Sequence, residues 1–522
     1  MDAKTIPVPQ GALVADVLRE KGFELDFDCG GAGICGKCRV SLIESDGSRR
    51  DVLACRARGA RGTRVDASNL KRTPSKICVP EETLEPVDVA EPERRGDLAL
   101  AVDLGSTTIV VALVSLESGR TLVVLSDRNP QVEFGRDVVS RIAAASDPAK
   151  ALRARALASG AIERLALKAA GALGLAPSRI VEIVVAGNTT MEYLLAGRDV
   201  RPLGVAPFVV EQKTFEPSSG RDFDWSAFPE ARVRLFPVRS AFIGGDVLAG
   251  LELPRGLGAF ERDESFMLLD FGTNGELLLS ARGRLFASSS AAGPAFEGAG
   301  ISQGSTAILG AIRRVDYDVP TRRWRARTIG DAPSASVCGS GLIDALAAAL
   351  DFGLLEPSGR FARADASRPS DGVFERIGER EGEPALLISS DARHPVWLTR
   401  RDVRQTQLAL GAMKACARLT LQASGLDAES LDALYLSGGF GTSLSARNGR
   451  RVGATPEGVG VEKIVRAGNS SLLGAIEATL GKVDFEELTE TSERIELVDL
   501  ASRADFAEVF AESTRFPEKS PE

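Results

Sequence analysis

The sequence of 522 residues contains a single histidine, His394, so its composition gives little support to histidine-based chemistry. A metal site built from several histidines, or a Ser-His-Asp hydrolase, would depend on that one side chain. The residue stands in the segment Arg393-His394-Pro395-Val396, just before a predicted helix, which favours a surface loop over a catalytic role. Both classes of protein are therefore disfavoured.

Two widespread phosphate-binding motifs are also missing. The sequence contains no Gly-x4-Gly-Lys-Ser/Thr motif, with which P-loop enzymes cradle phosphates. It contains no Gly-x-Gly-x2-Gly motif after the first strand of its large module, where a dinucleotide-binding fold would carry one. P-loop and dinucleotide-binding folds are therefore disfavoured.

Membrane and nucleic-acid signals are weak as well. No run of 18 apolar residues occurs, so the sequence predicts no membrane-spanning helix. The first five residues, Met1-Asp2-Ala3-Lys4-Thr5, lack the apolar core of a signal peptide, which indicates a cytoplasmic protein. The 64 Lys and Arg are outnumbered by 72 Asp and Glu, which disfavours a general nucleic-acid binder. The length of 522 residues predicts two or three domains, and the 44% apolar content excludes a disordered or collagen-like chain.

Four of the seven cysteines crowd the N-terminal part of the chain, and their spacing predicts an iron–sulfur site. Cys29, Cys35 and Cys38 lie in one glycine-rich loop, and Cys55 follows after 16 residues. A 2Fe–2S cluster needs four thiolates, three of which commonly come from one tight loop. Zinc held by the same four thiolates is the alternative, but structural zinc sites usually pair two Cys-x2-Cys knuckles, and Cys55 has no such partner.

Basic residues gather in the same region. Between Arg39 and Lys76 there are ten Lys or Arg and four Asp or Glu, a local net charge of +6. The patch is either a solvated face or a docking surface for an acidic redox partner, since complementary charge raises encounter rates. Nucleic acid is a weaker option, because the patch belongs to a predicted cluster-binding domain.

Changes in composition divide the chain into two modules. Residues 1–78 carry the four cysteines and are expected to form the first domain, and 79–96 contain prolines among acidic residues and read as a solvated linker. Beyond them, apolar strands alternate with glycine turns and alanine-rich helices, the pattern of an α/β domain. We expect two lobes, over 97–265 and 266–485, and an acidic tail over 486–522 to which we assign no function.

Two strand-to-turn segments of the large module look alike. An apolar strand over 98–102 leads into Asp103-Leu104-Gly105, and another over 266–269 leads into Asp270-Phe271-Gly272. A second apolar strand follows each turn. This repetition suggests two related lobes that face one cleft, where Asp103 and Asp270 would hold Mg²⁺ through water, because a hard cation prefers oxygen ligands.

The turns are rich in glycine and hydroxyl side chains, as a phosphate site requires. Several backbone N–H groups must converge on a phosphate, and glycine permits that close approach while Ser and Thr add donors. Two further glycine-rich stretches strengthen the prediction of a nucleotide site. One, at 436–441, follows a strand over 433–435, and the other, at 338–341, precedes a predicted helix. The residues expected to bind the nucleotide are Gly105, Ser106, Thr107, Thr108, Gly272, Thr273, Asn274, Gly275, Gly339, Ser340, Gly341, Gly438, Gly439 and Phe440.

A long helix is predicted before the Gly438 stretch. Thr399 and Asp402 have the spacing of a capping box, and Gly425 is a typical helix end. The apolar stripe of this helix indicates core packing.

The large module resembles the actin, sugar-kinase and heat-shock-chaperone ATPase superfamily (ASKHA), in which two duplicated, ribonuclease H-like lobes clamp Mg·ATP. In this resemblance the Asp103 segment matches the first phosphate loop, the Asp270 segment the second, and Gly438-Gly439 the adenosine loop. The expected fold is therefore α/β, with a small β-grasp ferredoxin-like α+β domain ahead of a two-lobed ATPase domain.

With the ferredoxin-like module included, the chain resembles the ATP-dependent reductive activators of corrinoid proteins over roughly residues 20–480. The linker is too short to contain the middle domain that longer members carry, so we expect this middle domain to be absent. The stretches that carry the resemblance are Asn129-Pro130-Gln131, Phe134-Gly135-Arg136-Asp137, Ala186-Gly187-Asn188-Thr189-Thr190-Met191, Gly244-Gly245-Asp246, Ala292-Gly293-Pro294-Ala295-Phe296-Glu297-Gly298 and Gly468-Asn469-Ser470-Ser471.

The resemblance implies an activity. An inactive Co(II) corrinoid in a partner protein would be reduced by one electron to Co(I), through a 2Fe–2S cluster on the four cysteines and with Mg·ATP as the driving ligand. It implies a low-potential electron donor of unknown identity, and we expect a homodimer. Asp103 and Asp270 would position Mg²⁺, and Asp246 or Glu276 would orient the attacking water.

Two other functions stay open. An electron pump for a radical dehydratase or reductase would also use this ATPase fold, but those activators share a 4Fe–4S cluster across a dimer and lack a ferredoxin domain. A non-enzymatic ATP-binding redox sensor or scaffold, in which the cluster only reports, would carry the same motifs.

Overall fold

The computed structural model describes residues 5–20, 38–68, 96–362, 373–390, 395–438 and 444–518. Several candidates from the sequence, and the predicted linker up to residue 95, lie outside these ranges. Those candidates are Cys29, Cys35, His394, Gly439 and Phe440.

The described part of the N-terminal module, residues 5–20 and 38–68, forms a four-stranded antiparallel sheet and one short helix. The strands follow the order β1-β4-β2-β3, and the helix packs into a small apolar core that also takes in Cys38 and Cys55. This agrees with the predicted α+β domain. The elements are β1 Thr5–Pro7, α1 Val14–Glu20, β2 Arg39–Ile43, β3 Arg49–Leu53 and β4 Arg64–Asp66.

Six strands form the sheet of the first lobe: β5 Leu98–Leu104, β6 Thr108–Ser115, β7 Thr121–Arg128, β8 Ile180–Gly187, β9 Ser218–Ser219 and β10 Arg232–Leu235. Their order is β7-β6-β5-β8-β10-β9. β5 pairs antiparallel with β6 and parallel with β8. It reads as a continuous apolar run because both of its faces are covered.

The second lobe repeats this arrangement with β11 Phe266–Phe271, β12 Gly275–Ala281, β13 Arg284–Ser290, β20 Ala433–Ser437, β21 Ile464–Gly468 and β22 Glu496–Leu497. The order is β21-β20-β11-β12-β13-β22. β11 pairs antiparallel with β12 and parallel with β20, as β5 does with β6 and β8. The prediction of two related lobes is confirmed.

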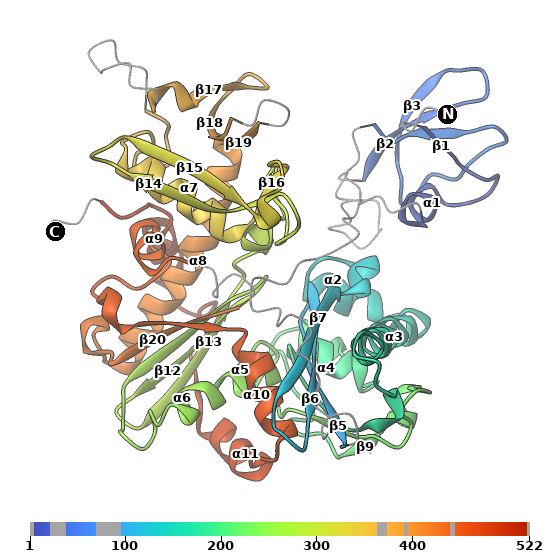
Figure 1. The fold of residues 1–522 in the computed structure, drawn as a ribbon, viewed down its shortest axis with the longest axis vertical. Helices are drawn as coiled ribbons and strands as arrows, with labels where there is room; N and C mark the ends of the chain where they lie inside the picture. The colour runs from blue at the N-terminus through green and yellow to red at the C-terminus, as the bar shows by residue number, and fades with distance from the viewer. Residues whose placement is uncertain are drawn as a thin grey trace.

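Helices cover the outer face of each sheet and also fill the space between the sheets (Figure 1). α3 Pro148–Ala172 packs on β6 and β7, and α8 Arg400–Ser424 packs on β12 and β13. Between the sheets, α10 Ser470–Thr479 contacts α5 Gly245–Gly250, β5 and β8. One apolar core therefore joins both lobes, and it contains side chains from β5, β11, α5 and α10.

The predicted helix beginning after Thr399 is confirmed in detail. The Thr399 hydroxyl accepts from the Asp402 N–H (3.2 Å), and the Asp402 carboxylate accepts from the Thr399 N–H (2.8 Å). Gly425 ends α8 with a φ of 68°. The apolar stripe of α8 is buried in the core of the second lobe, as predicted.

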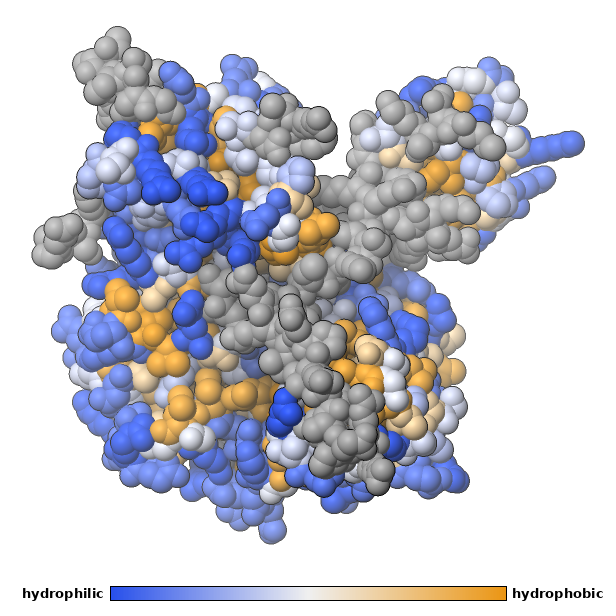
Figure 2. Space-filling view, viewed as in Figure 1, coloured by the Kyte–Doolittle hydropathy of each residue, from blue (hydrophilic) through white to orange (hydrophobic). Residues whose placement is uncertain are grey.

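The C-terminal segment differs from the expected acidic tail. β22 pairs in parallel with β13, and α12 Phe506–Ser513 packs on α8. α11 Phe485–Arg494 buries Leu488, and Figure 2 shows hydrophilic side chains over this helix, at the bottom of the view. Residues 486–518 thus belong to the second lobe. Their acidic side chains mark an exposed face, and the apolar residues between them pack on the lobe.

In the described part of the large module, two small sheets and five more helices complete the fold. The sheets are β14 Ala311–Asp318, β15 Arg323–Thr328 and β16 Ser336–Val337, and β17 Ile377–Arg380, β18 Glu383–Ser389 and β19 Val396–Thr399. The helices are α2 Val138–Ala145, α4 Thr189–Leu195, α6 Glu252–Gly256, α7 Gly339–Asp351 and α9 Ala446–Val452. Among the described residues, no helix is both long and apolar enough to cross a membrane.

Candidate functional site

Asp103 and Asp270 occupy equivalent places, one residue before the end of β5 and of β11. Asp103 pairs in register with Ala186 of the neighbouring parallel strand, and Asp270 pairs with Ser437. Gly438 follows with a φ of 96°, and a Cβ at this position would lie 2.8 Å from Asp270 Oδ1. The backbone after β20 therefore approaches the carboxyl group as closely as only glycine allows.

Asp103 is held by side chains from the start of α10. Its carboxylate accepts from Asn469 Nδ2 (2.6 Å) and from Ser471 Oγ (3.0 Å). Burial raises the pKa of Asp103 to about 6, although these two hydrogen bonds oppose the shift. Asp270 accepts from Ser437 Oγ (2.8 Å), and burial raises its pKa as well.

The predicted phosphate turns of the two lobes meet through their threonines. Thr107 Oγ1 lies 2.7 Å from Thr273 Oγ1, although the two residues are 166 positions apart in the sequence. Thr273 Oγ1 also donates to the carboxylate of Glu297, at 3.0 Å. The structure thus brings together two of the hydroxyls that the sequence predicts to hold phosphate, and it adds a carboxyl group beside them.

Asp246, which is partly buried, and Glu276, which is buried, lie in the same acidic surroundings. Burial, followed by repulsion from Asp270 and Asp103, raises the pKa of Asp246 to about 7. Burial and the charges of Asp246 and Asp270 raise the pKa of Glu276 well above its usual range. A cation in the cleft would stabilise the ionised forms. Within the part of the chain that the structure describes, however, no three acidic, Cys or His side chains are arranged to hold a metal ion.

A buried arginine forms hydrogen bonds with the backbone of the first phosphate turn. Arg141 of α2 donates to the carbonyl oxygens of Ser106 (2.5 Å) and Gly135 (3.1 Å) and contacts Met191 Sδ at 3.0 Å. Asn129 Nδ2 donates to the Gly105 carbonyl (2.8 Å), so it holds the same turn. The stretch from Asn129 to Arg141 therefore shapes the backbone that would meet phosphate.

Not every predicted glycine faces the cleft. A Cβ on Gly275 would lie 1.9 Å from Met413 Sδ, so this glycine lets β12 pack against α8. A Cβ on Gly341 would lie 2.1 Å from the Ile312 carbonyl, which fits α7 against β14. Gly105 closes its turn by donating to the Thr108 carbonyl at 3.1 Å.

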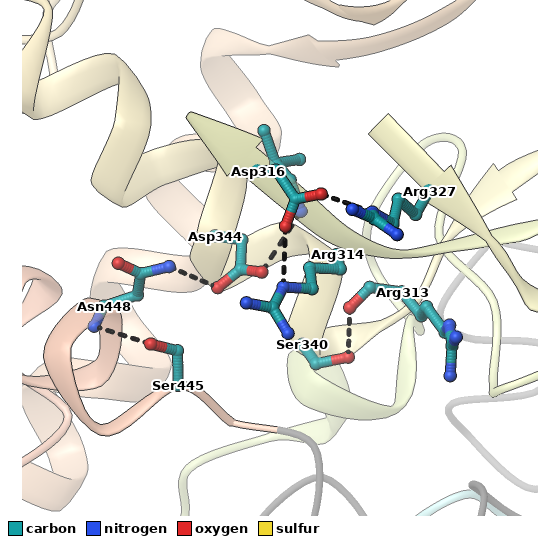
Figure 3. A network of polar contacts seen from close by, with 9 residues as sticks. Arg313, Arg314, Asp316, Arg327, Ser340, Asp344, Ser445 and Asn448 are labelled. Carbon is teal, nitrogen blue, oxygen red and sulfur yellow. Dashed lines mark hydrogen bonds and ion pairs between the residues drawn. The ribbon is translucent and has the colours of Figure 1, made fainter. Parts of the chain in front are cut away.

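The start of α7 is tied into a polar network with β14 and α9 (Figure 3). Ser340 Oγ donates to the Arg313 carbonyl at 2.8 Å, so its hydroxyl already has a protein partner. Asp344 accepts from Asn448 Nδ2 (2.6 Å) and from the Val315 N–H (3.1 Å). α9 follows the glycine-rich stretch at 438–443, and this network fixes its position relative to the Gly339-Ser340-Gly341 turn.

In the N-terminal module, two of the four predicted cluster ligands lie together. Cys38 Sγ and Cys55 Sγ are 3.3 Å apart, and both side chains are buried. The sulfurs are too far apart for a disulfide, whose bond length is about 2.05 Å. Two thiols at this separation fit a shared metal centre. The other two predicted ligands lie outside the described residues.

Comparison with known protein families matches almost the whole chain. The model of the 2Fe-2S iron-sulfur cluster binding domain matches residues 2–59. The model of the RACo middle region matches residues 98–254, and that of the C-terminal ASKHA domain of RACo matches residues 264–522. The chain belongs to the RACo family. The α+β ferredoxin-like module and the two-lobed ASKHA domain are those of this family.

Relatives and a solved structure agree with the RACo assignment. The corrinoid activation enzyme RamQ of Eubacterium limosum is 27% identical, over 98% of this chain and 97% of RamQ. The [Co(II) methylated amine-specific corrinoid protein] reductase of Methanosarcina barkeri is 26% identical over 76% of this chain and 72% of its own length. A solved reductive activator for corrinoid, iron-sulfur protein superposes with a TM-score of 0.74 at 25% identity, covering 99% of this chain and 97% of the other.

The RACo comparison corrects one expectation. The sequence suggested that the middle domain of longer relatives is absent, but the middle-region model matches 98–254, which is the first lobe. The length of the linker says nothing about this region, because the middle region follows the linker in the sequence and does not lie within it.

Some residues around the cleft could not be singled out from the sequence. Arg141 acts through a contact with Ser106, 35 positions away in the sequence. Glu192 acts through the nearby Gly187 N–H and through its approach to Gly245. Glu297, Asn469 and Ser471 lie in stretches noted only for their resemblance. A signal existed for Arg141, which stands between Val138 and Ile142 on the buried face of α2. A charged residue on an apolar helix face indicates a specific buried partner.

Proposed function

We propose that this RACo-family chain performs the ATP-dependent reductive activation of a corrinoid protein, in which Co(II) takes up one electron and becomes Co(I). The named activities of its relatives support the reaction. The observation that carries the nucleotide part is the meeting of two duplicated turns at Thr107 and Thr273, beside the buried Asp103 and Asp270.

The residues divide the work between two modules. A 2Fe–2S cluster would supply one-electron transfer when bound, and the ligands proposed for it are Cys29, Cys35, Cys38 and Cys55. In the cleft, Asp103 and Asp270 would hold the water shell of Mg²⁺, whose charge compensates theirs. The turn hydroxyls and N–H groups would bind phosphate, and Asp246 or Glu276 would orient the attacking water.

ATP is needed because the corrinoid requires an electron at a lower potential than the cluster supplies. A 2Fe–2S centre of the ferredoxin type lies near about −400 mV. If the corrinoid requires an electron about 100 mV lower, the deficit is about 2.3 kcal/mol. Binding or hydrolysis of Mg·ATP can offset this deficit by stabilising a complex in which the cobalt is easier to reduce.

Asp270→Asn tests the proposal. With Mg·ATP, a chemical reductant and a Co(II) corrinoid protein, the initial rate of Co(I) formation should fall by about 100-fold or more, since a buried group aimed at the phosphate and metal is neutralised. The visible spectrum of the cluster should stay unchanged. Asp263→Asn, an exposed position shortly before β11, is the matched control and should behave as wild type.

Either of two results would contradict the proposal. Wild-type rates in Asp270→Asn would remove the nucleotide assignment, and no Co(I) formation by the wild-type chain with any corrinoid protein would remove the reaction. The homodimer, the need for a low-potential electron donor and the cytoplasmic location stay predictions. Light scattering measures the first of them.

A further inference from the structure

Glu192 is a buried carboxyl group that connects two parts of the cleft. It lies in the first turn of α4 and has no exposed surface. Its Oε1 accepts from the N–H of Gly187, at the end of β8 (3.0 Å), and the N–H of Gly245, at the start of α5, is a second donor to the same carboxyl group. One side chain thus joins the strand next to β5 with the loop that carries Asp246.

The glycine pair before Asp246 is shaped by this contact. A Cβ on Gly245 would lie 2.3 Å from Glu192 Oε1, and a Cβ on Gly244 would lie 2.5 Å from the Thr189 N. The Thr189 hydroxyl also donates to the Ser240 carbonyl at 2.7 Å. The first turn of α4 therefore holds the loop 240–246 at several points, and the Gly-Gly-Asp sequence is what allows the approach.

The second oxygen of Glu192 indicates the charge of the group. Among the described residues, Oε2 is buried and has no hydrogen-bond partner. A buried ionised oxygen without partners is strongly unfavourable, whereas a neutral acid avoids most of that penalty. The titratable group facing Glu192 is Asp246, and burial together with this neighbour raises the pKa of Glu192 well above its usual range.

We propose that Glu192 is a positioning residue that stays a neutral carboxylic acid and fixes the Gly244–Asp246 loop, so that Asp246 points toward Asp103 and Asp270. The role is distinct from metal or phosphate binding. It rests on the proposed function in one respect, which is that Asp246 acts in ATP hydrolysis.

Conservative variants separate positioning from charge. Glu192→Gln keeps the accepting oxygen and the neutral charge, so kcat for Mg·ATP hydrolysis should stay within about threefold of wild type. Glu192→Asp is one methylene shorter and cannot reach both amides, so kcat should fall by about tenfold or more while KM for ATP changes little. Glu252→Gln, a buried acid on α6 that pairs with Arg255, is the control and should behave as wild type.

Amide hydrogen exchange of the full chain tests the same contact without relying on activity. The peptide covering 240–250 should exchange as in wild type for Glu192→Gln and faster for Glu192→Asp and Glu192→Ala. If Glu192→Gln is as inactive as Glu192→Ala, the proposal that Glu192 is a neutral acid is overturned. If Glu192→Asp equals wild type in kcat and in amide exchange, the positioning role is overturned. A wild-type chain without ATP hydrolysis would instead refute the proposed function, and the exchange data would still decide whether Glu192 holds the loop.

Discussion

At the scale of single residues, the cleft is dominated by carboxyl groups whose ionised forms are disfavoured by burial. They are Asp103, Glu192, Asp246, Asp270, Glu276 and Glu297, and the pKa of each is raised with burial as the largest cause. Asp103 and Asp270 could be predicted from the sequence, because each follows an apolar strand and precedes a glycine turn. Asp246 and Glu276 were candidates only through the family resemblance. Glu192 and Glu297 could not be predicted as site residues, since only the folded chain determines their burial and their neighbours.

The raised pKa of Asp246 predicts a pH-dependent stability. An unfolded Asp ionises near its ordinary pKa of 3.8, whereas the pKa of Asp246 in the folded chain is about 7. Between these values the folded chain binds more protons than the unfolded chain, so the free energy of unfolding falls as pH rises, by up to about 1.4 kcal/mol per pH unit. In Asp246→Asn this contribution is missing.

Denaturant unfolding in the presence of EDTA measures the effect. Between pH 5 and 8, Asp246→Asn should gain stability relative to wild type as the pH rises, because only wild type must ionise this buried group. Removal of the Asp246 charge also lowers the raised pKa of Glu192 and of Glu276, which acts in the same direction. Parallel curves for the two proteins across this range would contradict the prediction.

Arg141 carries a second prediction at this scale. Arg141→Lys keeps a positive charge but loses the planar fork that reaches the Ser106 and Gly135 carbonyls together. We expect the free energy of unfolding to fall by about 2–4 kcal/mol, since a buried hydrogen-bonded charge loses partners. The Kd for Mg·ATP, measured by calorimetry, should rise by about tenfold. Arg153→Lys on the exposed side of α3 is the control, and equal Kd values for both variants would refute the supporting role of Arg141.

At the scale of elements, local signals decided what could be predicted. The capping box at the start of α8 and the glycine at its end each depend on residues close together in the sequence. Both limits of this helix were therefore predicted correctly. The start of α10 is different. Asn469 caps this helix by accepting from the Leu472 N–H (2.8 Å), which is local, but its amide also donates to Asp103, 366 residues away. That contact depends on the packing of the two lobes, so no sequence pattern near either residue could reveal it.

The double role of Asn469 yields a prediction for the element. Asn469→Asp keeps a good N-cap, so α10 should remain folded. It replaces the donor to Asp103 by a second carboxylate, however, and two like charges in a buried site repel each other. We expect the rate of ATP hydrolysis to fall by at least about tenfold, with little change in helix content by circular dichroism. Ser471→Ala removes the other donor without adding charge and should have a smaller effect, so an equal loss in both variants would argue against repulsion.

At the scale of the whole molecule, the duplication was predictable because each lobe repeats one short pattern at the end of its central strand. The role of the C-terminal residues was not, since a composition rich in Glu describes the exposed face of α11 and says nothing of the pairing between β22 and β13. The core that α5 and α10 share with both sheets was also not predicted, because it forms only when the two lobes pack together. Because these two helices pack against both sheets, a change in the angle between the lobes must move the loop that carries Asp246.

The two-module architecture predicts that electron transfer and ATP hydrolysis can be separated by one substitution. Cys38→Ser removes one thiol of the buried pair with Cys55, so the protein should lose its visible cluster spectrum and most of its bound iron. Formation of Co(I) should become undetectable, while Mg·ATP hydrolysis should stay within about threefold of wild type, because every described nucleotide-site residue lies beyond residue 98. Cys338→Ala, a buried thiol of the second lobe, should keep the cluster spectrum. Full iron content in Cys38→Ser would contradict the cluster assignment, and loss of ATP hydrolysis in this variant with an unchanged melting temperature would mean that the cluster-binding module takes part in the ATPase cycle itself.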